Sequence, residues 1–417
     1  MNTDPKPGFR LTRLEDYAPL IGRASVARIG QKARALRGAR VAHVNSTYYG
    51  GGVAEILGPL TLLMNALGIA TDWRVMRGSA EFFEFTRAMH DALQGRAVDP
   101  APRGARAYEQ VLYENALRNR LDECDLVVVH DPQPAALIRH YAKRAPWIWR
   151  CHVDLSAPHP GAWQYLAQFV ERYDAVVLSC PEYARDLRVA QHFFFPAIDP
   201  FSPKNRPLGA RDIDERLARY GIPTDLPLVV QVSRFDRWKD PEGVIDAFQL
   251  ARRKAPATLV LLGNFASDDP QGEEVFKALM RRREERVLIL PHGDDTLLVN
   301  ALQRRAAVVL QKSLREGFGL TVTEAMWKGR PVIGGAAGGI RHQIDDGENG
   351  FLVASIEQAA ERMVELLRDA GLRARLGRAA KEKARQNFLL TRYLEQYLDL
   401  FASLRGAGRA QRLPRAA

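Results

Sequence analysis

Residues 307–327 read Ala-Val-Val-Leu-Gln-Lys-Ser-Leu-Arg-Glu-Gly-Phe-Gly-Leu-Thr-Val-Thr-Glu-Ala-Met-Trp. The apolar run at 307–310 predicts a strand, and the apolar spacing from Leu320 onward predicts a helix. Between them, Gly317 and Gly319 allow a sharp turn, so the free N–H groups of residues 318–321 point out of the helix start. Those groups and the helix dipole both attract negative charge, and the stretch therefore predicts an anion-binding site.

Two glutamates flank this turn. Glu316 precedes it, and Glu324 lies in the first part of the predicted helix. Carboxylates beside a phosphate repel it unless they bind something else, and a carboxylate can accept hydrogen bonds from vicinal sugar hydroxyls. Helix capping by both glutamates is the alternative, but capping does not account for the two glycines. The stretch predicts a site for a phosphorylated sugar.

The same order of strand, loop and helix recurs along the rest of the chain. The predicted strands are Arg40–Val44, Thr71–Val75, Leu126–His130, Trp147–His152 and Ala175–Leu178 in the first half, then Leu228–Val232, Thr258–Leu262, Val287–Leu290, Ala307–Leu310 and Pro331–Ile333. Segments with helical spacing separate them, which is typical of parallel strands joined by helical crossovers. Phe195–Leu208 carries four prolines and no periodicity, as a linker does. We predict an α/β fold of two doubly wound, Rossmann-like domains that face each other across a cleft.

The expected domain boundaries follow from this pattern. The N-terminal domain covers residues 1–200 and starts with a helical extension over 1–38, and the C-terminal domain covers 209–388. Residues 389–417 hold a helix and then a basic tail. The helix can pack on either domain, and we take packing back on the N-terminal domain as the working expectation.

Composition narrows the class of protein. The 417 residues carry a formal net charge of +11, with 46% hydrophobic and 26% charged residues, which is ordinary for a globular chain. No apolar run approaches the ~20 residues of a membrane-spanning helix. The three cysteines are too few and too scattered for a disulfide framework or a zinc site, and no nucleic-acid-binding motif is present. We expect a cytoplasmic protein with no nucleic-acid partner and no stable membrane insertion.

Polar residues follow the predicted strands of the first half. A glycine loop that includes Gly51 and Gly52 comes after the first strand, and it fits either a ligand loop or a plain tight turn. His130, Asp131 and Gln133 end one strand, and His152 and Asp154 follow the next. Strand ends at the mouth of a cleft are where catalytic side chains project. Structural histidines and helix-capping aspartates remain the alternative.

Two cations occupy one loop of the second half. Arg234 and Lys239 follow the strand Leu228–Val232. Surface cations are the alternative, but a guanidinium fork and a mobile ammonium at a strand end suit a diphosphate.

Taken together, these residues resemble the retaining glycosyltransferases of the GT-B fold, specifically glycosyltransferase family 4. The resemblance spans both halves and includes the Gly338-Gly339 loop. It implies that the N-terminal domain binds the acceptor and the C-terminal domain binds a nucleotide sugar. The expected catalytic residues are His152, Arg234, Lys239 and Glu316. The expected donor-binding residues are Gly51, Gly52, Asn264, Phe318, Gly319, Leu320, Thr321 and Glu324.

A narrower resemblance is to the trehalose glycosyltransferring synthases. It rests on several N-terminal stretches, among them His43–Leu57, His130–Gln133 and Arg150–Ser156. It implies a hexosyltransferase that reversibly joins glucose from an NDP-glucose to free glucose, giving α,α-trehalose. His130, Asp131, Gln133 and Asp154 are the expected acceptor-binding residues. Gln311-Lys312-Ser313 replaces the more usual Pro-Ser before the glutamate motif, so recognition of the base is expected to differ there.

The resemblance also sets expectations for partners and cofactors. The partners are a nucleotide sugar and glucose, with no tightly bound cofactor and no metal ligand, and Mg²⁺ is compatible with a stimulating role. A homodimer is compatible as well. Another family 4 transferase, with a sugar phosphate or a lipid-linked sugar as acceptor, is the alternative function. A nucleotide-sugar epimerase and a non-catalytic binding protein fit the two glutamates, Lys239 and His152 less well.

Overall fold

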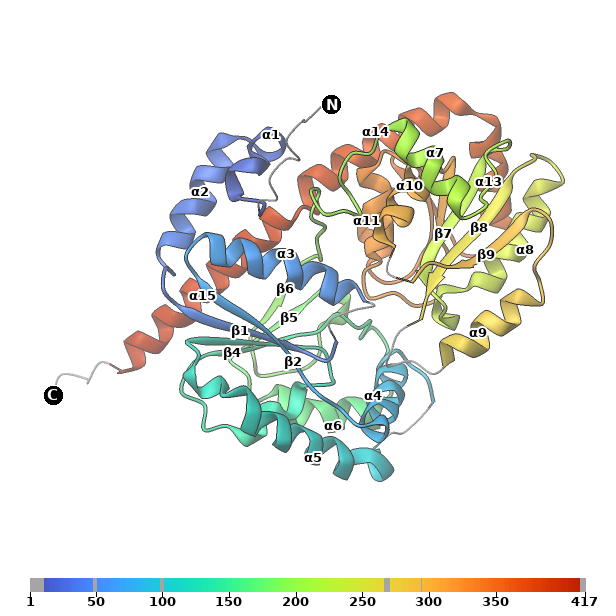
Figure 1. Cartoon of the computed structure of the whole chain (residues 1–417). Coiled ribbons are helices and arrows are strands. Elements are labelled where there is room, and N and C mark those ends of the chain that lie inside the picture. The colour runs from blue at the N-terminus through green and yellow to red at the C-terminus, as the bar shows by residue number, and fades with distance from the viewer. Residues whose placement is uncertain (1–10, 48–50, 98–100, 266–270, 294, 413–417) are drawn as a thin grey trace, which may run out of the picture.

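The computed structural model describes residues 11–47, 51–97, 101–265, 271–293 and 295–412. Two six-stranded parallel sheets form the centres of two domains, with strand orders β2-β1-β3-β4-β5-β6 and β12-β11-β10-β7-β8-β9 (Figure 1). Helices cover both faces of each sheet. The predicted α/β architecture of two doubly wound domains is therefore confirmed.

The first domain holds six strands and most of the N-terminal helices. Its strands are β1 (Arg40–Asn45), β2 (Ala70–Val75), β3 (Leu126–His130), β4 (Trp147–Arg150), β5 (Ala175–Leu178) and β6 (Gln191–Phe193). Its longer helices are α2 (Arg23–Arg34), α3 (Gly52–Ala66), α4 (Ala80–Leu93), α5 (Ala101–Asn119) and α6 (Pro160–Val170), with the short α1 (Ala18–Ile21) before them. The predicted strand Trp147–His152 ends at Arg150, so His152 lies in the loop beyond the strand. The sequence pattern missed α5 and the three-residue edge strand β6.

The second domain repeats the plan. Its strands are β7 (Leu228–Arg234), β8 (Thr258–Asn264), β9 (Val287–Pro291), β10 (Val308–Gln311), β11 (Val332–Gly335) and β12 (Gly350–Val353). Its helices are α7 (Ala210–Arg219), α8 (Pro241–Arg252), α9 (Gln271–Met280), α10 (Thr296–Arg305), α11 (Leu320–Trp327), α12 (Ile340–Gln343), α13 (Ile356–Arg368) and α14 (Ala370–Asn387). The sequence pattern missed β12, which begins with a glycine.

Each sheet separates two apolar cores. On β3, Val127 and Val129 pack on one side, and Leu126 and Val128 pack on the other. This alternation explains why the central strands are apolar along their whole length, since parallel strands are buried on both faces. Helices close the cores on both faces of each sheet. The carboxyl ends of the strands are left open.

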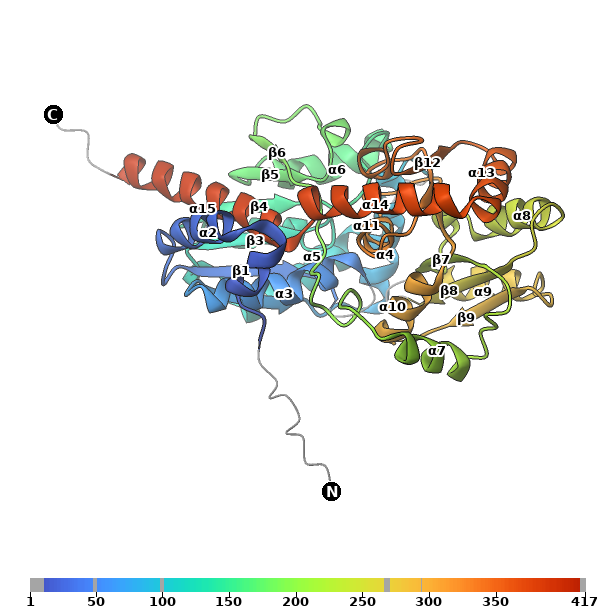
Figure 2. The same ribbon diagram turned by 90° about the horizontal axis from the view of Figure 1, so that it is seen from above.

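The helix α15 (Leu390–Arg412) returns from the second domain to the first (Figures 1 and 2). Its side chains Tyr393, Tyr397 and Phe401 are buried in the core of the first domain. The expectation that this helix packs on the N-terminal domain agrees with the placement of these aromatic residues. No helix among the described residues combines the length and hydropathy needed to cross a membrane.

Two chain segments cross between the domains side by side. Ile198, in the proline-rich segment, forms a parallel bridge with Leu389, just before α15. The N–H of Ile198 donates to the carbonyl of Phe388 at 2.9 Å, and the N–H of Leu390 donates to the carbonyl of Ile198 at 2.9 Å. The domains are therefore joined at one narrow, hydrogen-bonded place, the geometry expected of a hinge.

Candidate active site

The carboxyl ends of both sheets face a cleft of about 340 Å³ between the domains. All but one of the site residues expected from the sequence line it: Gly51, Gly52, His130, Asp131, Gln133, His152, Arg234, Lys239, Asn264, Glu316, Phe318, Gly319, Leu320, Thr321 and Glu324. The exception is Asp154, which lines a neighbouring cavity with Tyr183 and Arg315. Residues Tyr48, Tyr49 and Gly50 of the glycine loop lie outside the described residues.

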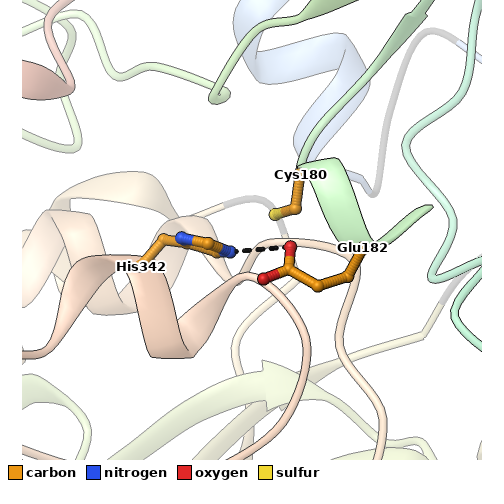
Figure 3. A group of neighbouring side chains, drawn as sticks. All are labelled: Cys180, Glu182 and His342. Carbon is orange, nitrogen blue, oxygen red and sulfur yellow. Dashed lines mark hydrogen bonds and ion pairs between the residues drawn. The ribbon is translucent and has the colours of Figure 1, made fainter. Parts of the chain in front are cut away.

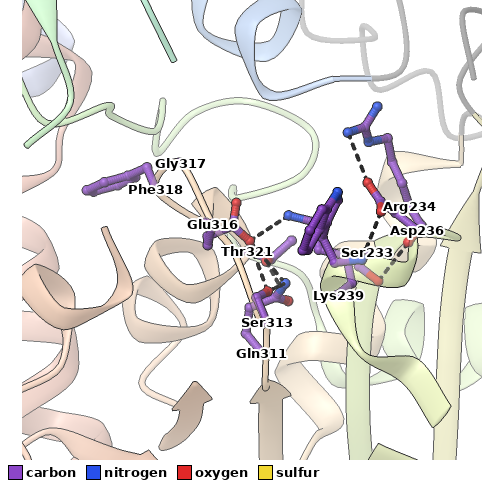
Figure 4. A network of polar contacts seen from close by, with 12 residues as sticks. Ser233, Arg234, Asp236, Lys239, Gln311, Ser313, Glu316, Gly317, Phe318 and Thr321 are labelled. Carbon is purple, nitrogen blue, oxygen red and sulfur yellow. Dashed lines mark hydrogen bonds and ion pairs between the residues drawn. The ribbon is translucent and has the colours of Figure 1, made fainter. Parts of the chain in front are cut away.

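Lys239 and Glu316 form an ion pair at the centre of the cleft (Figure 4). Lys239 Nζ lies 2.6 Å from Glu316 Oε2, and both side chains are largely buried, with exposed fractions of 16% and 9%. Ser313 Oγ donates to the same carboxylate oxygen at 3.1 Å, and Gln311 Nε2 lies 3.4 Å from it. The Gln311-Lys312-Ser313 segment, which departs from the usual sequence, therefore helps to hold the first glutamate in place.

Arg234 has a looser setting than Lys239. It is the last residue of β7, its side chain is 31% exposed, and its Nη2 lies 3.6 Å from Asp236 Oδ2. Asp236 is buried and also caps the turn that carries Lys239, because Oδ1 accepts the N–H of Trp238 at 2.9 Å. A guanidinium that is held weakly and faces the cleft can turn toward an anion at small cost.

The turn before α11 takes the shape that its glycines require. Gly319, the residue before the helix, has φ +85°, a conformation that residues with a Cβ adopt at a cost. A Cβ on Gly317 would stand 1.9 Å from the carbonyl oxygen of His152, so only glycine fits where this turn meets the first domain. The N-terminus of α11 thus opens into the cleft, as the anion-binding interpretation expects.

Glu324 lies deeper than the sequence suggested and has partners from both domains. It is 1% exposed, and its Oε2 accepts a hydrogen bond from Gln303 Nε2 at 3.1 Å. Lys204 Nζ, from the segment that joins the domains, lies 3.3 Å from Glu324 Oε1 and 2.6 Å from Glu55 Oε1 at the start of α3. Burial lowers the pKa of Lys204, but the carboxylates of Glu324 and Glu55 outweigh it and hold that pKa above its ordinary value.

On the opposite wall, Asp131 and Gln133 present oxygen atoms to the cleft. Asp131 has φ +67°, and its Oδ1 accepts the N–H of His152 at 2.6 Å, so it ties two loops together and does not cap a helix. Burial raises the pKa of Asp131 to about 6. Gln133 Oε1 is buried and, among the described residues, accepts no hydrogen bond. An unpaired buried acceptor at a cleft wall indicates a ligand hydroxyl.

Asp154 does not join this group. It is 2% exposed, its Oδ1 accepts the N–H of Ser156 at 2.9 Å, and its Oδ2 lies 3.9 Å from Arg315 Nη1 of the other domain. The turn formed with Ser156 accounts for its burial. Asp154 thus forms a local turn and does not cap a helix, the alternative that the sequence left open, and its expected role in binding the acceptor stays a prediction.

A separate cluster joins the domains outside the cleft. Candidate ligand atoms of Cys180, Glu182 and His342 lie within 4.8 Å of one another (Figure 3). His342 Nε2 of the second domain lies 3.0 Å from Glu182 Oε2 of the first. Burial raises the pKa of the Cys180 thiol to about 12, so the sulfur is protonated at neutral pH. We interpret the cluster as a contact between the domains beside a buried thiol.

Three residues in or behind the cleft wall were not predicted as site residues: Lys204 lines the cleft, and His43 and Arg150 are buried behind it. Lys204 sits in a linker, where no periodicity fixes the direction of a side chain. His43 lies within β1, two residues before the strand ends. Its contact with His130 depends on the register between β1 and β3. Arg150, 0% exposed, reads as an ordinary cation in the sequence. The sequence did offer one signal for a histidine cluster: His130 ends β3, and His152 follows the neighbouring strand β4.

Two family models match the chain. Residues 43–185 match the model described as "Trehalose synthase, N-terminal domain", and residues 212–383 match "Glycosyl transferases group 1". The trehalose synthase of Pyrococcus horikoshii is 44% identical over 402 residues, which is 94% of this chain and 97% of that protein. The trehalose synthase of Rubrobacter xylanophilus is 40% identical over 413 residues, covering 96% and 98%.

Solved structures are similar in fold. A UDP-forming α,α-trehalose-phosphate synthase from Burkholderia vietnamiensis superposes with a TM-score of 0.69 at 15% identity, covering 89% of this chain and 99% of that one. The Anabaena protein HepE in complex with UDP-glucose superposes with a TM-score of 0.66 at 18% identity, covering 88% and 100%. The arrangement of the two domains is the GT-B fold.

Proposed function

The chain belongs to the trehalose synthase family, and on that premise we propose that it transfers glucose from an NDP-glucose to free glucose, forming α,α-trehalose. It is a hexosyltransferase that acts in trehalose metabolism. Beyond this family membership, we propose the identity of the donor and of the acceptor, retention at the anomeric carbon, and membership of glycosyltransferase family 4. The observation that carries it is the convergence of Lys239, Glu316 and the α11 N-terminus at one point of the cleft.

The donor would lie along the wall of the second domain. Its diphosphate would contact Arg234, Lys239 and the free N–H groups at the start of α11, and its ribose hydroxyls would donate to Glu324. These cations stabilise the charge that develops on the leaving diphosphate. The similarity in fold to a protein that binds UDP-glucose supports a nucleotide sugar as the ligand.

Glu316 would contact the transferred glucose through its hydroxyls. Because Lys239 and Ser313 already hold its carboxylate, it is fixed in direction before the sugar arrives, which lowers the cost of orienting the substrate. Among the described residues we assign no carboxylate as a nucleophile, and we favour transfer in which the acceptor attacks from the face of the sugar that the diphosphate leaves. The leaving phosphate would then take the proton of the attacking hydroxyl.

The acceptor glucose would bind at the wall of the first domain. Gln133 Oε1 and the Asp131 carboxylate can accept hydrogen bonds from its hydroxyls, and His152, which lines the same cleft, would face the donor sugar. No tightly bound cofactor is needed for this scheme, because side chains and helix N–H groups supply the positive charge. Mg²⁺ would act only as a stimulating ion.

A panel of donors and acceptors tests the proposal. The protein is incubated with ADP-, UDP-, GDP- or TDP-glucose together with glucose or glucose 6-phosphate, and a non-reducing disaccharide is sought. Trehalose from an NDP-glucose and free glucose is the expected product. Product only with glucose 6-phosphate, or no disaccharide from a donor that binds, would overturn the proposed acceptor and leave the family membership in place.

A further inference from the structure

Three histidines form a diagonal line across the first sheet toward the cleft. His43 on β1 is paired in register with Val128 of β3, and His130 lies two residues beyond Val128. His130 is paired with Arg150 of β4, and His152 lies two residues beyond Arg150. A step of two residues keeps the side chains on the same face of a sheet, so each histidine reaches the next one nearer the open edge.

The rings are joined by two hydrogen bonds. His43 Nδ1 lies 3.0 Å from His130 Nε2, and His130 Nδ1 lies 3.2 Å from His152 Nε2. The ring planes are inclined by 31° and 18°, so the second pair is nearly parallel. The outer nitrogens of this histidine line are His43 Nε2, which is buried, and His152 Nδ1, on the residue that lines the cleft.

All three rings are held neutral. Burial lowers the pKa of His43 to about 3 and holds the pKa of both His130 and His152 well below the usual histidine value. The Arg150 guanidinium, fully buried, opposes a further positive charge on His130 and His152. A neutral imidazole carries one N–H and one lone pair, so its two nitrogens have different roles.

Counting protons leaves two arrangements. Three neutral rings carry three N–H protons, and the two bonds between the rings use two of them. The third proton therefore sits on one outer nitrogen, either His43 Nε2 or His152 Nδ1. His43 Nε2 has no hydrogen-bond partner among the described residues, and the ring of Tyr397 lies 5.8 Å from that of His43. A buried N–H without an acceptor is rare in proteins, so the proton belongs at the cleft end.

We propose that His43 and His130 are positioning residues for His152: their hydrogen bonds fix the tautomer in which His152 Nδ1 carries the proton and donates a hydrogen bond to a hydroxyl of the sugar in the cleft. The inference rests on the proposed function for the identity of the sugar. In each bond the ring that lies farther from the cleft donates: His43 Nδ1–H donates to His130 Nε2, and His130 Nδ1–H donates to His152 Nε2. His152 cannot then accept a proton at Nδ1 and serves as a donor.

Two substitutions at His43 separate this role from packing. His43→Phe keeps an aromatic ring, somewhat larger than the imidazole, but removes the donor, whereas His43→Asn loses volume but places an amide N–H near the position of Nδ1. The histidine line predicts a kcat at least roughly tenfold lower for His43→Phe, with KM for the donor unchanged, and recovery of most of that loss in His43→Asn. If His43 acts only by packing, His43→Asn should have the lower kcat of the two variants and His43→Phe the higher. His192→Phe, on β6 of the same sheet, is the control and should match the unsubstituted enzyme.

The tautomer can be read without turnover. In ligand-free protein labelled with ¹⁵N-histidine, long-range ¹H–¹⁵N correlations should show a protonated Nδ1 and an unprotonated Nε2 for His152, assigned by its loss in His152→Gln. In His43→Phe the His152 signals should move toward a mixture of the two tautomers. A proton on Nε2 of His152, or an unchanged tautomer in His43→Phe, would overturn the inference. If no donor yields a disaccharide, the proposed function fails by itself, and the nitrogen signals still decide the tautomer.

Discussion

Asp131 shows how one buried carboxylate can set the response of the enzyme to pH. Its carboxylate accepts the backbone N–H of His152, it lines the first-domain wall of the cleft, and its pKa is raised to about 6 by burial. The neighbouring histidines do not titrate in the same range, because the pKa values of His130 and His152 are held well below the usual value. Asp131 is thus a group on this wall whose charge changes near pH 6.

We expect kcat/KM for glucose, measured at saturating donor, to fall as the pH drops below about 6. The sign follows from the carboxylate: above its pKa Asp131 is ionised and accepts bonds from the sugar, and below its pKa the proton removes one acceptor. The loss should approach about tenfold for each pH unit below the pKa. Asp131→Asn should be less active but nearly flat over the same range. If kcat/KM of Asp131→Asn still falls in the same way below about pH 6, another group is responsible for the pH dependence.

The residue scale also shows where sequence reasoning can locate a site and where it stops. Arg234, Lys239 and Glu316 follow strands of one parallel sheet, whose carboxyl ends share an edge, so their proximity could be predicted. Lys204 could not, because the path of a proline-rich linker is set by the contacts of both domains. The line from His43 to His152 also needs the strand register, which a single sequence does not give.

At the scale of elements, α15 is a C-terminal helix that completes the N-terminal core. Phe401 is fully buried there, with its ring 5.4 Å from that of Tyr397. On the polar side of the same helix, Glu395 and Asp399 form ion pairs with Lys32 of α2. The core of the first domain is therefore complete only with α15 in place.

Phe401→Ala should lower the free energy of unfolding of the first domain by about 3–5 kcal/mol, the usual cost of removing a buried phenyl ring. Native-state hydrogen exchange can measure it domain by domain, with faster exchange expected in β1–β5 and little change in β7–β12. Asp399→Ala is the control on the same helix, because its side chain is 57% exposed and such pairs contribute only about 0–1 kcal/mol. Equal acceleration in both sheets would show that α15 does not belong to the first domain.

Element prediction from the sequence succeeded where local signals were strong. The strand predicted at Ala307–Leu310 appears as β10, shifted by one residue at each end, and the predicted helix appears as α11, which begins at Leu320 as expected, since Gly317 and Gly319 fix the turn locally. The missed strands β6 and β12 are short edge strands of three and four residues, respectively. Their pairing comes from the neighbouring strand, not from their own composition.

At the scale of the whole molecule, the domains meet through a small set of polar contacts around the cleft. Tyr183 of the first domain donates to the carbonyl of Glu316 at 2.8 Å, and Arg315 Nη1 donates to Ser156 Oγ at 3.0 Å. Trp238 Nε1 donates to Asp91 Oδ1 at 3.3 Å. The chain segments at Ile198 and Leu389 are paired through their backbones. We expect the two domains to open and close about this place.

Lys204 lies in the segment that joins the domains and forms an ion pair with one carboxylate from each domain. Without it, Glu55 on α3 and Glu324 on α11 would face each other as like charges across the closed cleft. The side chain of Lys204 is 13% exposed, so water screens that repulsion only in part. We therefore expect the lysine at this position to favour closure and to hold the Glu324 carboxylate in place.

Lys204→Met should weaken binding of the nucleotide at least roughly tenfold, since loss of one partner leaves a buried charge unpaired. Small-angle scattering of the nucleotide-free variant should show a larger radius of gyration, because the repelling carboxylates sit on different domains. Adding Glu55→Gln to Lys204→Met removes the like charge and should recover most of the affinity and the compact shape, and Lys204→Arg should change little. If the double variant binds no better than Lys204→Met, repulsion between the domains is not the cause, and Lys204 acts only by orienting Glu324.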